Sequence, residues 1–584
     1  MRTKNRILLA AVPFALTGVI LAGCTAVAAD LESGTATTQT ASVQDVDASL
    51  TAEQVLDENA DATTVTADEA ETGSETTISL AGESATVDGD GATVDGNTVT
   101  IAAAGTYRVS GALAGSIVVA APDDAVVALI LDGVDIANTD GAAIAITGAD
   151  DVAIVLADGS ENGLSDADSY ADDAEVNAAL YSDADLTISG SGALTVTGNG
   201  NDGITSKDDL TILAGTIVVT AADDGLRGKD SLTLAGGTVT VDAGGDGLSS
   251  DQDADETQGY IWISGGDLDV TSAGDGLAAA TDVVLTGGDV TIESGGGSTA
   301  NRGADVSAKG VKGGVYVVLE GATVSVDAAD DAVHSNGAVH INDGAIMLAS
   351  GDDGVHADTA LAIDGGSLTV AKSYEGLEST DISIAGGTID VTASDDGLNA
   401  SSGSGESMQD SGEMITISGG DTTVHAGGDG FDSNGSAEMT GGSLTIWGPT
   451  NDGNGAIDVN GSFDVSGGTL LAAGSAGMAV APSTDSAQGW VFATTDGDAG
   501  STVEILADGQ VVGEYVADTS FATVVYSGAG IVAGSTYEVT VDGVSTTVTA
   551  GEGGASGMGP GQGGQQGGGM PGGTRPGQSE DDGS

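Results

Sequence analysis

Positive charge is scarce in this sequence: 12 Lys and Arg residues stand against 89 Asp and Glu residues, which gives a formal net charge of −77. Such a chain repels nucleic acid, so nucleic acid is excluded as a partner. Aromatic residues make up only 3% while Gly reaches 97 residues, a composition that favours stacked short strands and tight turns. With 40% hydrophobic residues the chain lacks the signature of a disordered protein, and we expect it to fold.

Cysteine is nearly absent. Cys24 is the only one, which excludes disulfides and Cys-based zinc sites. Three basic residues near the start precede an apolar run over 7–22, which is too short and wrongly flanked for a stable membrane span and is typical of an export signal. The stretch "LAGC" at 21–24 resembles the lipobox of bacterial lipoproteins. That resemblance implies removal of residues 1–23, lipidation of Cys24 and anchoring on the outer face of the bacterial cell membrane; the alternative is an ordinary secretory signal with a chance Cys.

Two segments are expected to be unfolded. Residues 24–75 are rich in Thr, Ala, Asp and Glu without sustained apolar periodicity, and we interpret them as an acidic linker. Residues 549–584 form a tail rich in Gly, Gln and Pro. The folded part is therefore expected over 76–548.

An internal repeat dominates this region. The Gly that follows an acidic turn recurs, often at steps of 22 residues, at Gly203, Gly225, Gly247, Gly276, Gly310, Gly354, Gly376, Gly397, Gly430 and Gly453, with Ala332 in one unit. Each unit reads as strand, Gly-Gly turn, strand and acidic turn, as in "SLTLAGGTVTVDAGGDGL" over 231–248. Leu232, Leu234, Val239 and Val241 alternate with Ser and Thr, the period-two pattern of half-buried strands.

These units predict an all-β chain: a right-handed parallel β-helix with about 22 residues per coil over 76–484. A propeller is the main rival, but its blades need about 40 residues and four strands. Residues 485–548 keep the alternation but lose the acidic unit, which predicts a small antiparallel β cap or subdomain over the last coil.

Stacking would place the turn acids of successive coils about 4.8 Å apart, where carboxylates repel unless a cation lies between them. Converging oxygen atoms suit Ca²⁺. The candidate calcium ligands are Asp224, Asp246, Asp330, Asp331, Asp352, Asp353, Glu375, Glu378, Asp395, Asp396, Asp429 and Asp432. The alternative is that Asp-Gly is simply a good turn dipeptide and that the acids form a solvated edge.

Two His residues fall within this pattern. His334 and His356 occupy the same position of successive units and are expected to stack one coil apart. They are interpreted as hydrogen-bond donors, with a transition-metal site as the alternative. Platforms for stacking of neutral sugars are few: Tyr260, Trp262, Tyr316, Tyr374, Phe431, Trp447 and Trp490, most of which are expected to be buried or packed in turns.

A series of segments resembles a known family. They are "GTYRVSGALAGSIVV" (105–119), "NAALYSDADLTISGSGALTVTG" (177–198), "NDGITSKDDLTI" (201–212), "DDAVHSN" (330–336), "DDGVHAD" (352–358), "SYEGLES" (373–379) and "GPTNDGNGAIDVNG" (448–461). Together they look like the bacterial carbohydrate-binding domain family of exported calcium-binding β-helices, which is similar to β-helical polysaccharide lyases. The chain departs from the family at Lys309, where a Lys replaces the turn acid and should interrupt the metal column.

The resemblance implies a calcium-dependent protein that binds acidic, pectin-like or cellulose-like polysaccharide. We expect the protein to be a monomer. His334, His356, Lys372 and Tyr374 are the candidate sugar contacts. Two other functions stay open. In a calcium-dependent lyase a basic residue removes a sugar proton, and Lys372 beside "SYEGLES" is the candidate base. The second open function is that of a surface adhesin or structural β-helix that does not bind sugar. Among these functions we favour non-catalytic carbohydrate binding.

Overall fold

The computed structural model describes residues 46–66, 69, 75–171, 173–300, 307–402 and 410–554. The predicted export signal, Cys24 and nearly all of the Gly-rich tail lie outside these residues. The described chain is almost entirely β, with 48 strands and the single helix α1 (Ala52–Glu58). No helix in the described ranges has the length and apolar character needed to cross a membrane.

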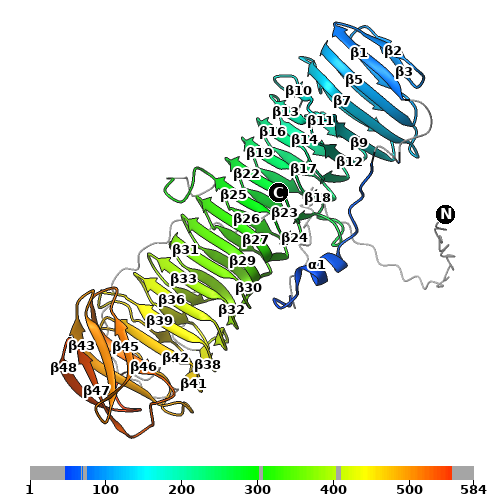
Figure 1. The fold of residues 1–584 in the computed structure, drawn as a ribbon. Helices are drawn as coiled ribbons and strands as arrows, with labels where there is room; N and C mark the ends of the chain where they lie inside the picture. Colours follow the sequence, from blue (N-terminus) through cyan, green and yellow to red (C-terminus); the bar gives the residue numbers. More distant parts are fainter. Residues whose placement is uncertain are drawn as a thin grey trace, which may run out of the picture. The chain divides into compact units, whose positions relative to one another are not determined.

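The strands form coils that stack in succession, and each coil contributes one segment to each of three parallel sheets (Figure 1). One coil consists of β17 (Leu226–Gly228), β18 (Ser231–Leu234) and β19 (Thr238–Ala243). Its strands pair in parallel with β20 (Leu248–Ser250), β21 (Tyr260–Ile263) and β22 (Asp267–Ser272) of the next coil. The predicted β-helix is therefore confirmed, and the 22-residue step appears directly in pairs such as Leu226 with Leu248.

The first sheet carries the strands that follow the acidic turn. Besides β17 and β20 it contains β4 (Thr98–Ile101), β6 (Ser116–Ala120), β8 (Ile144–Gly148), β11 (Ala178–Ser182), β14 (Asp202–Ser206), β23 (Leu277–Ala279), β26 (Val311–Gly313), β28 (Val333–Ser335), β34 (Leu398–Ala400), β37 (Phe431–Ser433) and β40 (Asp458–Val459), with the first residues of β30 (Val355–Ile363) and β32 (Leu377–Ile384).

The second sheet lies between the first sheet and the Gly-Gly turn. It contains β1 (Thr76–Gly82), β5 (Gly105–Ala114), β7 (Val126–Ala137), β9 (Asp151–Leu156), β12 (Asp185–Gly190), β15 (Asp209–Ile212), β18, β21, β24 (Asp282–Leu285), β35 (Met414–Ile417), β38 (Ser436–Met439) and β41 (Phe463–Val465), the later residues of β30 and β32, and the first residues of β27 (Tyr316–Ala328) and β29 (Ala338–Ser350).

The third sheet follows the Gly-Gly turn. It contains β10 (Glu161–Ser165), β13 (Ala193–Gly198), β16 (Thr216–Ala221), β19, β22, β25 (Asp289–Ser294), β31 (Ser367–Ser373), β33 (Thr388–Ala393), β36 (Asp421–Ala426), β39 (Ser443–Trp447) and β42 (Thr469–Gly474), with the later residues of β27 and β29.

Aliphatic ladders from all three sheets fill one continuous core. Leu226, Leu248 and Leu277 are in register on the first sheet and are fully or almost fully buried. Burying such a side chain contributes about 1.5–3 kcal/mol. The Gly of the acidic turn is a condition of this packing, because a Cβ at Gly225 would lie 2.2 Å from Cγ1 of Val241 in the core. The repeat therefore keeps a small residue at this place.

Antiparallel strands close both ends of the coil stack. At the start, β2 (Ala85–Asp88) pairs with β1 and β3 (Ala92–Asp95) pairs with β4. At the end, β46 (Phe521–Ser527) pairs with β42 of the last coil and with β43 (Trp490–Gly497). The remaining strands, β44 (Thr502–Ala507), β45 (Gln510–Val516), β47 (Thr536–Val541) and β48 (Val544–Thr549), form a separate sheet. Pairing across the last coil removes an open edge that would invite aggregation.

The predicted unfolded linker is wrong for residues 46–66, which we call the strap. Thr51 caps α1 in a capping box, and Ala52 and Val55 pack against Val284 and Val318 on the outer side of the second sheet. Further on, Val65 packs against Ala128 and Ala153. The physical reason is that these outward residues of the sheet are apolar and are covered by the few apolar residues of the strap.

Polar contacts hold the strap across many coils. The Leu50 carbonyl lies 2.7 Å from Nδ1 of His340, and the Tyr260 hydroxyl donates to the Ala60 carbonyl at 2.8 Å. At its far end, the Val65 N–H donates to the Thr187 hydroxyl at 3.0 Å. Because the partners run from His340 back to Thr187, the strap crosses successive strands of the second sheet and ties their coils together.

A strap that is part of the fold predicts a stability effect. Val55→Ala removes two buried methyl groups and should lower the free energy of strap opening by about 2 kcal/mol. Hydrogen–deuterium exchange in residues 52–58 should then accelerate about 30-fold. The matched control is Val544→Ala, since Val544 is 69% exposed. Equal exchange in both variants would show that the strap does not depend on this packing.

Candidate functional site

The acids of successive turns stack into one column, which we call the ridge. It consists of Asp202, Asp224, Asp246, Asp275, Lys309, Asp331, Asp353, Glu375, Asp396 and Asp429. The N–H of the turn Gly donates to the carbonyl of the ridge residue one coil on, as from Gly225 to Asp246 at 2.9 Å and from Gly397 to Asp429 at 2.8 Å. The stacking that the 22-residue spacing predicts is thus present in the backbone.

A second column runs beside the ridge on the first sheet, and we call it the strand column. It contains the middle residue of each short strand: Thr205, Arg227, Ser249, Ala278, Lys312, His334, His356, Glu378, Asn399, Asp432 and Asp458. In β34 the flanking Leu398 and Ala400 face the core, so the side chain of Asn399 lies on the other side of the sheet.

One oxygen of most ridge carboxylates has a structural task. Oδ1 of Asp224 accepts from the N–H of Asp246 at 2.9 Å, and Oδ1 of Asp246 accepts from the N–H of Asp275 at 2.7 Å. Oδ1 of Asp331 accepts in the same way from Asp353 at 3.1 Å. The turn role that we weighed as the alternative is therefore real, and it leaves the second oxygen to interact with the strand column.

In the N-terminal half, side-chain cations compensate the ridge. Lys312 Nζ lies 3.4 Å from Asp275 Oδ2, and Arg227 Nη1 lies 4.0 Å from Asp202 Oδ2. Lys309 Nζ lies 3.1 Å from Asp330 Oδ2 and 3.4 Å from Asp331 Oδ2. Burial alone would raise the pKa of Asp331, but the Lys309 ammonium holds that pKa below its usual range. Lys309 thus occupies the place that a metal would take between these two acids.

The His pair lies in the strand column, beside Asp331 and Asp353 of the ridge. The rings of His334 and His356 stack with centroids 5.0 Å apart, as their spacing predicts. Nδ1 of His334 lies 2.9 Å from Asp331 Oδ2, and Nδ1 of His356 lies 3.0 Å from Asp353 Oδ2. Burial lowers the pKa of His356, but its bonds to neighbouring carboxylates outweigh burial and hold the pKa well above the usual value.

In the C-terminal half, the described residues show no such compensation of Asp396, Asp429 and Asp432. We call Glu375, Asp396, Asn399, Asp429 and Asp432 the acidic cluster. Burial and neighbouring carboxylates raise the pKa of Asp432 to about 9, and burial together with the Asp429 charge raises the pKa of Asp396 to about 7. Burial also raises the pKa of Asp429 to about 6. Within the described residues, no Lys, Arg or His forms an ion pair with Asp396, Asp429 or Asp432.

Asn399 is oriented inside this cluster. Its Nδ2 donates to Glu375 Oε2 at 2.7 Å, which fixes which end of the amide is the carbonyl. Its Oδ1 is buried and has no hydrogen-bond partner among the described residues. An unsatisfied buried carbonyl oxygen next to carboxylates is a ready cation ligand, because leaving it unpaired costs about 1–3 kcal/mol.

The other predicted site residues lie around these columns. Oδ atoms of Asp330, Asp331 and Asp352 come within 4.8 Å of one another. The N–H of Asp395 donates to the Tyr374 carbonyl at 2.9 Å. Burial raises the pKa of Asp224 and brings that of Asp246 to about 7, with Arg227 and Lys312 nearby. Asp224 and Asp246 therefore lie in the N-terminal half of the ridge, where Arg and Lys side chains already compensate the carboxylates.

Lys372 does not lie in either column. It is an exposed residue of β31 on the third sheet, and its ammonium donates to the Ser298 carbonyl. β31 contains a register shift, in which Ala349 pairs with Lys372 rather than with Ala371. This bulge precedes the turn that contains the half-buried Tyr374 and the buried Glu375. No signal in the sequence predicted the bulge.

None of the Trp, Tyr and Phe residues in the described ranges is exposed. Tyr260, Phe431, Trp447 and Trp490 are buried, while Trp262 and Tyr316 pack against the strap. The predicted burial of most of these side chains is confirmed, and no flat aromatic platform faces solvent in the described part of the chain.

Sequence reasoning missed two groups. Asp458 follows Asp432 in the strand column, and an alignment of the last repeat would have found it. Asp185, Asp208 and Asp209 converge within 4.8 Å at the turn between the first and second sheets. Burial and the Asp185 charge raise the pKa of Asp208 to about 7.

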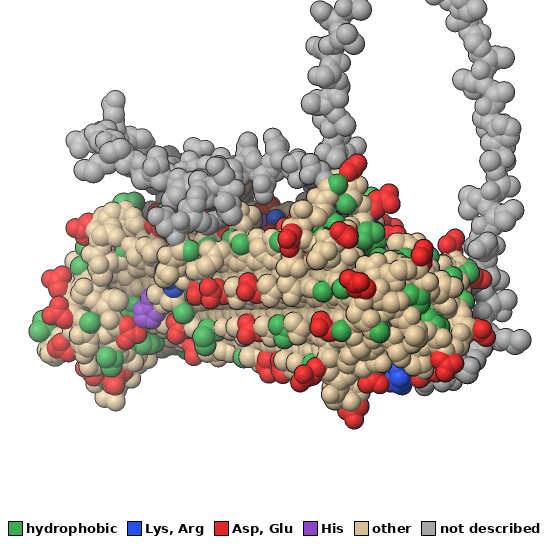
Figure 2. Space-filling view, turned by 90° about the horizontal axis from the view of Figure 1, so that it is seen from above, with side chains coloured by type: hydrophobic (Ala, Val, Ile, Leu, Met, Phe, Trp, Pro, Cys, Tyr) green, Lys and Arg blue, Asp and Glu red, His purple; other side chains and the backbone are tan. Residues whose placement is uncertain are grey.

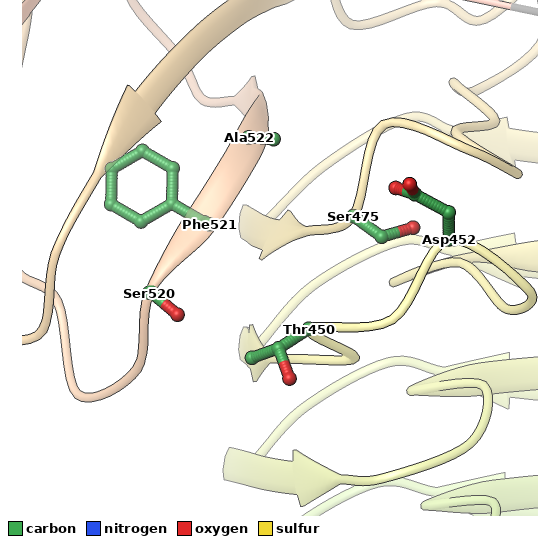
Figure 3. Close-up of a pocket in the computed structure, with 6 residues that line it drawn as sticks. All are labelled: Thr450, Asp452, Ser475, Ser520, Phe521 and Ala522. Carbon is green, nitrogen blue, oxygen red and sulfur yellow. The ribbon is translucent and has the colours of Figure 1, made fainter.

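The surface offers no deep cavity for a small ligand among the described residues. A hollow of about 150 Å³ lies at the last coil, lined by Thr450, Asp452, Ser475, Ser520, Phe521 and Ala522 (Figure 3). One face of the molecule displays many acidic and few basic side chains (Figure 2). The functional features are therefore charged surface columns, a form that suits an extended ligand better than an enclosed one.

Fold and columns together define an acidic parallel β-helix with stacked carboxylates along one edge. The chain belongs to the family of carbohydrate-binding domain-containing proteins, whose model matches residues 95–354 and 352–558. This confirms the resemblance seen in the sequence.

Two relatives add detail. A carbohydrate-binding domain-containing protein of Acetivibrio thermocellus is 36% identical over 128 residues, which are 21% of this chain and 45% of that protein. The match thus spans less than half of that curated relative. A solved structure, a gadolinium derivative of a polysaccharide lyase-like protein from C. thermocellum, shares 31% identity with a TM-score of 0.37, covering 46% of this chain and 97% of that one.

The raised carboxyl pKa values predict how stability changes with pH in the metal-free protein. Asp396 and Asp432 bind protons more tightly folded than unfolded, so their contribution is fully present below about pH 4 and is lost as pH rises through their folded pKa values of about 7 and about 9. The urea midpoint in chelator should therefore fall from about pH 5 to about pH 8.

Asp432→Asn should flatten this pH slope, because the amide cannot ionise. Asp390→Asn on the third sheet is the matched control, since Asp390 is exposed. A midpoint that rises with pH in the metal-free wild type would contradict the assignment of these carboxyls as uncompensated.

Proposed function

We propose that this protein is an exported carbohydrate-binding protein that holds Ca²⁺ at the acidic cluster and uses the ion to bind acidic polysaccharide without catalysis. The family match supports carbohydrate as the ligand class. The observation that carries the calcium step is the uncompensated cluster of Asp396, Asp429 and Asp432 beside the unsatisfied Asn399 oxygen.

The donor set of the cluster fits Ca²⁺. Glu375, Asp396, Asp429 and Asp432 offer carboxylate oxygens and Asn399 offers a carbonyl oxygen. Ca²⁺ takes six to eight such ligands at flexible angles, whereas Mg²⁺ demands a regular octahedron and transition metals prefer imidazole or thiolate. A bound Ca²⁺ ion would supply positive charge and open coordination positions to the polysaccharide.

Acidic rather than neutral polysaccharide is the ligand that the surface favours. Neutral, cellulose-like chains are bound by stacking on aromatic faces, and the described Trp, Tyr and Phe side chains are all at least partly buried. An acidic chain would be repelled by a protein of net charge −77 unless a cation bridges the two. Sugar carboxylates bound directly to Ca²⁺ satisfy both conditions, with His334, His356 and Tyr374 near enough along the ridge to be tested as additional contacts.

The cell surface is the proposed location. The stretch "LAGC" places Cys24 where a lipoprotein is acylated, and an acyl anchor would hold the β-helix outside the membrane where polysaccharides occur. The strap from residue 46 onwards then joins the folded domain to the anchored end.

Retention on immobilised polygalacturonate tests the calcium step. Wild type should bind in millimolar Ca²⁺ and be released by EGTA. Asp396→Asn with Asp432→Asn should lose retention. Asp390→Asn with Asp421→Asn, which alters the same number of carboxyl groups at exposed positions, should not. Simple charge repulsion would give the opposite order, with the double variant binding better than the wild type.

Three other results would overturn the proposal. Retention that survives EGTA would remove the role of calcium. Absence of retention on any polysaccharide in calcium would favour the adhesin. Release of unsaturated uronides, lost in Lys372→Ala, would instead assign a lyase.

Lipidation has its own test. In a bacterial host, the wild-type chain should incorporate a labelled fatty acid and fractionate with membranes, and Cys24→Ser should do neither because the acyl-accepting thiol is gone. Exposure to external protease would show the side of the membrane. Equal membrane association of both forms would contradict the anchor.

A further inference from the structure

The ring of His356 lies between two buried carboxylates. Its Nδ1 is 3.0 Å from Asp353 Oδ2, in the ridge, and 3.2 Å from Glu378 Oε2, in the strand column one coil on. Asp353 is 4% exposed and Glu378 is 3% exposed. Three donor atoms from two coils therefore converge, all within 4.8 Å of one another.

The spacing of these atoms is close to that of ligands on one metal ion. Ligand atoms of a tetrahedral Zn²⁺ ion bonded at about 2.0–2.1 Å lie about 3.3 Å apart. The two separations from Nδ1 to the carboxylate oxygens, 3.0 and 3.2 Å, fall just below this value. Small side-chain shifts would admit the ion.

Asp353 carries an independent sign of an absent ligand. Its Oδ1 is buried and has no hydrogen-bond partner among the described residues. In other coils the same oxygen accepts the N–H of the next ridge residue, as it does in Asp224, in Asp246 and in Asp331 of the preceding coil. Here the next coil contains the β31 bulge. The carboxylate is thus released from the turn and available to a cation.

The outer nitrogen of the His356 ring also has a carboxylate partner. Nε2 of His356 lies 3.1 Å from Asp358 Oδ1, so that Nε2–H can donate to this carboxylate while a metal ion replaces the proton on Nδ1, which faces Asp353 and Glu378. Metal-bound His residues commonly have such a carboxylate partner, which fixes the tautomer and raises the basicity of the ligand nitrogen.

We propose that Asp353, His356 and Glu378 bind a divalent transition-metal ion of the zinc class. The imidazole nitrogen separates this site from the oxygen-only acidic cluster, because imidazole suits Zn²⁺ and its neighbours in the transition series whereas Ca²⁺ prefers oxygen. The neighbouring group of Asp331, His334 and His356 is a weaker host, because Lys309 Nζ lies 3.4 Å from Asp331 Oδ2 and already supplies positive charge there.

Calorimetric titration of the full chain with Zn²⁺, in millimolar Ca²⁺, tests the site. The background is Cys24→Ser, so that the single thiol contributes no ligand. We expect one Zn²⁺ ion per chain, not displaced by Ca²⁺. His356→Gln and the isosteric Glu378→Gln should each weaken binding at least about 100-fold. Co²⁺ in place of Zn²⁺ should give visible absorption that both variants lose.

His425→Gln is the matched control, because His425 lies on the third sheet, 3.8 Å from Asp518, and should leave Zn²⁺ binding unchanged. Equal loss in His425→Gln would show nonspecific binding, full displacement by Ca²⁺ would assign the site to the calcium set, and no binding would end the proposal. Polysaccharide retention is measured in Ca²⁺ alone, so either proposal can fail without the other.

Discussion

Stacking at one interstrand distance is the constraint on which the whole structure depends. Each coil lies about 4.8 Å from the next, so residues at equivalent positions become neighbours whatever their charge. For Leu226, Leu248 and Leu277 this is favourable, because it builds a continuous apolar core. For the turn acids it is costly, because it brings carboxylates together under partial burial. The ridge meets that cost in different ways along its length. Backbone N–H groups satisfy one oxygen of most acids, and Arg227, Lys309 and Lys312 compensate the N-terminal half. In the C-terminal half, Asp396, Asp429 and Asp432 have no such cationic partner among the described residues.

The same stacking explains why the described surface has shallow hollows rather than a deep pocket. Flat sheets of short strands turn their aliphatic side chains inward and leave Thr, Ser and Asp outside, so recognition has to use an edge rather than a cavity. The aromatic residues that might have served as sugar platforms have structural tasks. Trp262 and Tyr316 pack against the strap, and Trp447 and Trp490 lie buried where the C-terminal strands cover the last coil. Charge is consequently the property that the surface has in excess.

Sequence reasoning succeeded where the signal is local and periodic. The 22-residue step predicts the coils, the ridge and the stacked rings of His334 and His356, because each follows from counting along the chain. It failed for the strap, since the apolar partners of Val55 are Val284 and Val318, more than 200 residues away. Sequence reasoning also could not tell which part of the ridge is compensated by side-chain cations. That distinction depends on side-chain directions, which spacing does not encode, as in the contact of Lys309 with Asp330 and Asp331 and the unsatisfied oxygen of Asn399.

Under the proposed function, this division decides where an acidic polysaccharide would bind. A Lys or Arg that already pairs with a ridge carboxylate offers a sugar carboxylate only a screened surface charge, because its own field is largely cancelled by the acid beside it. A divalent ion among Asp396, Asp429 and Asp432 differs in kind, since it exceeds the charge of any single neighbour and keeps coordination positions that the protein does not fill. Along one geometrically regular ridge, the choice between Lys309 and an Asp at the same turn position thus separates a stretch that side-chain cations compensate from the stretch that we propose as the binding site.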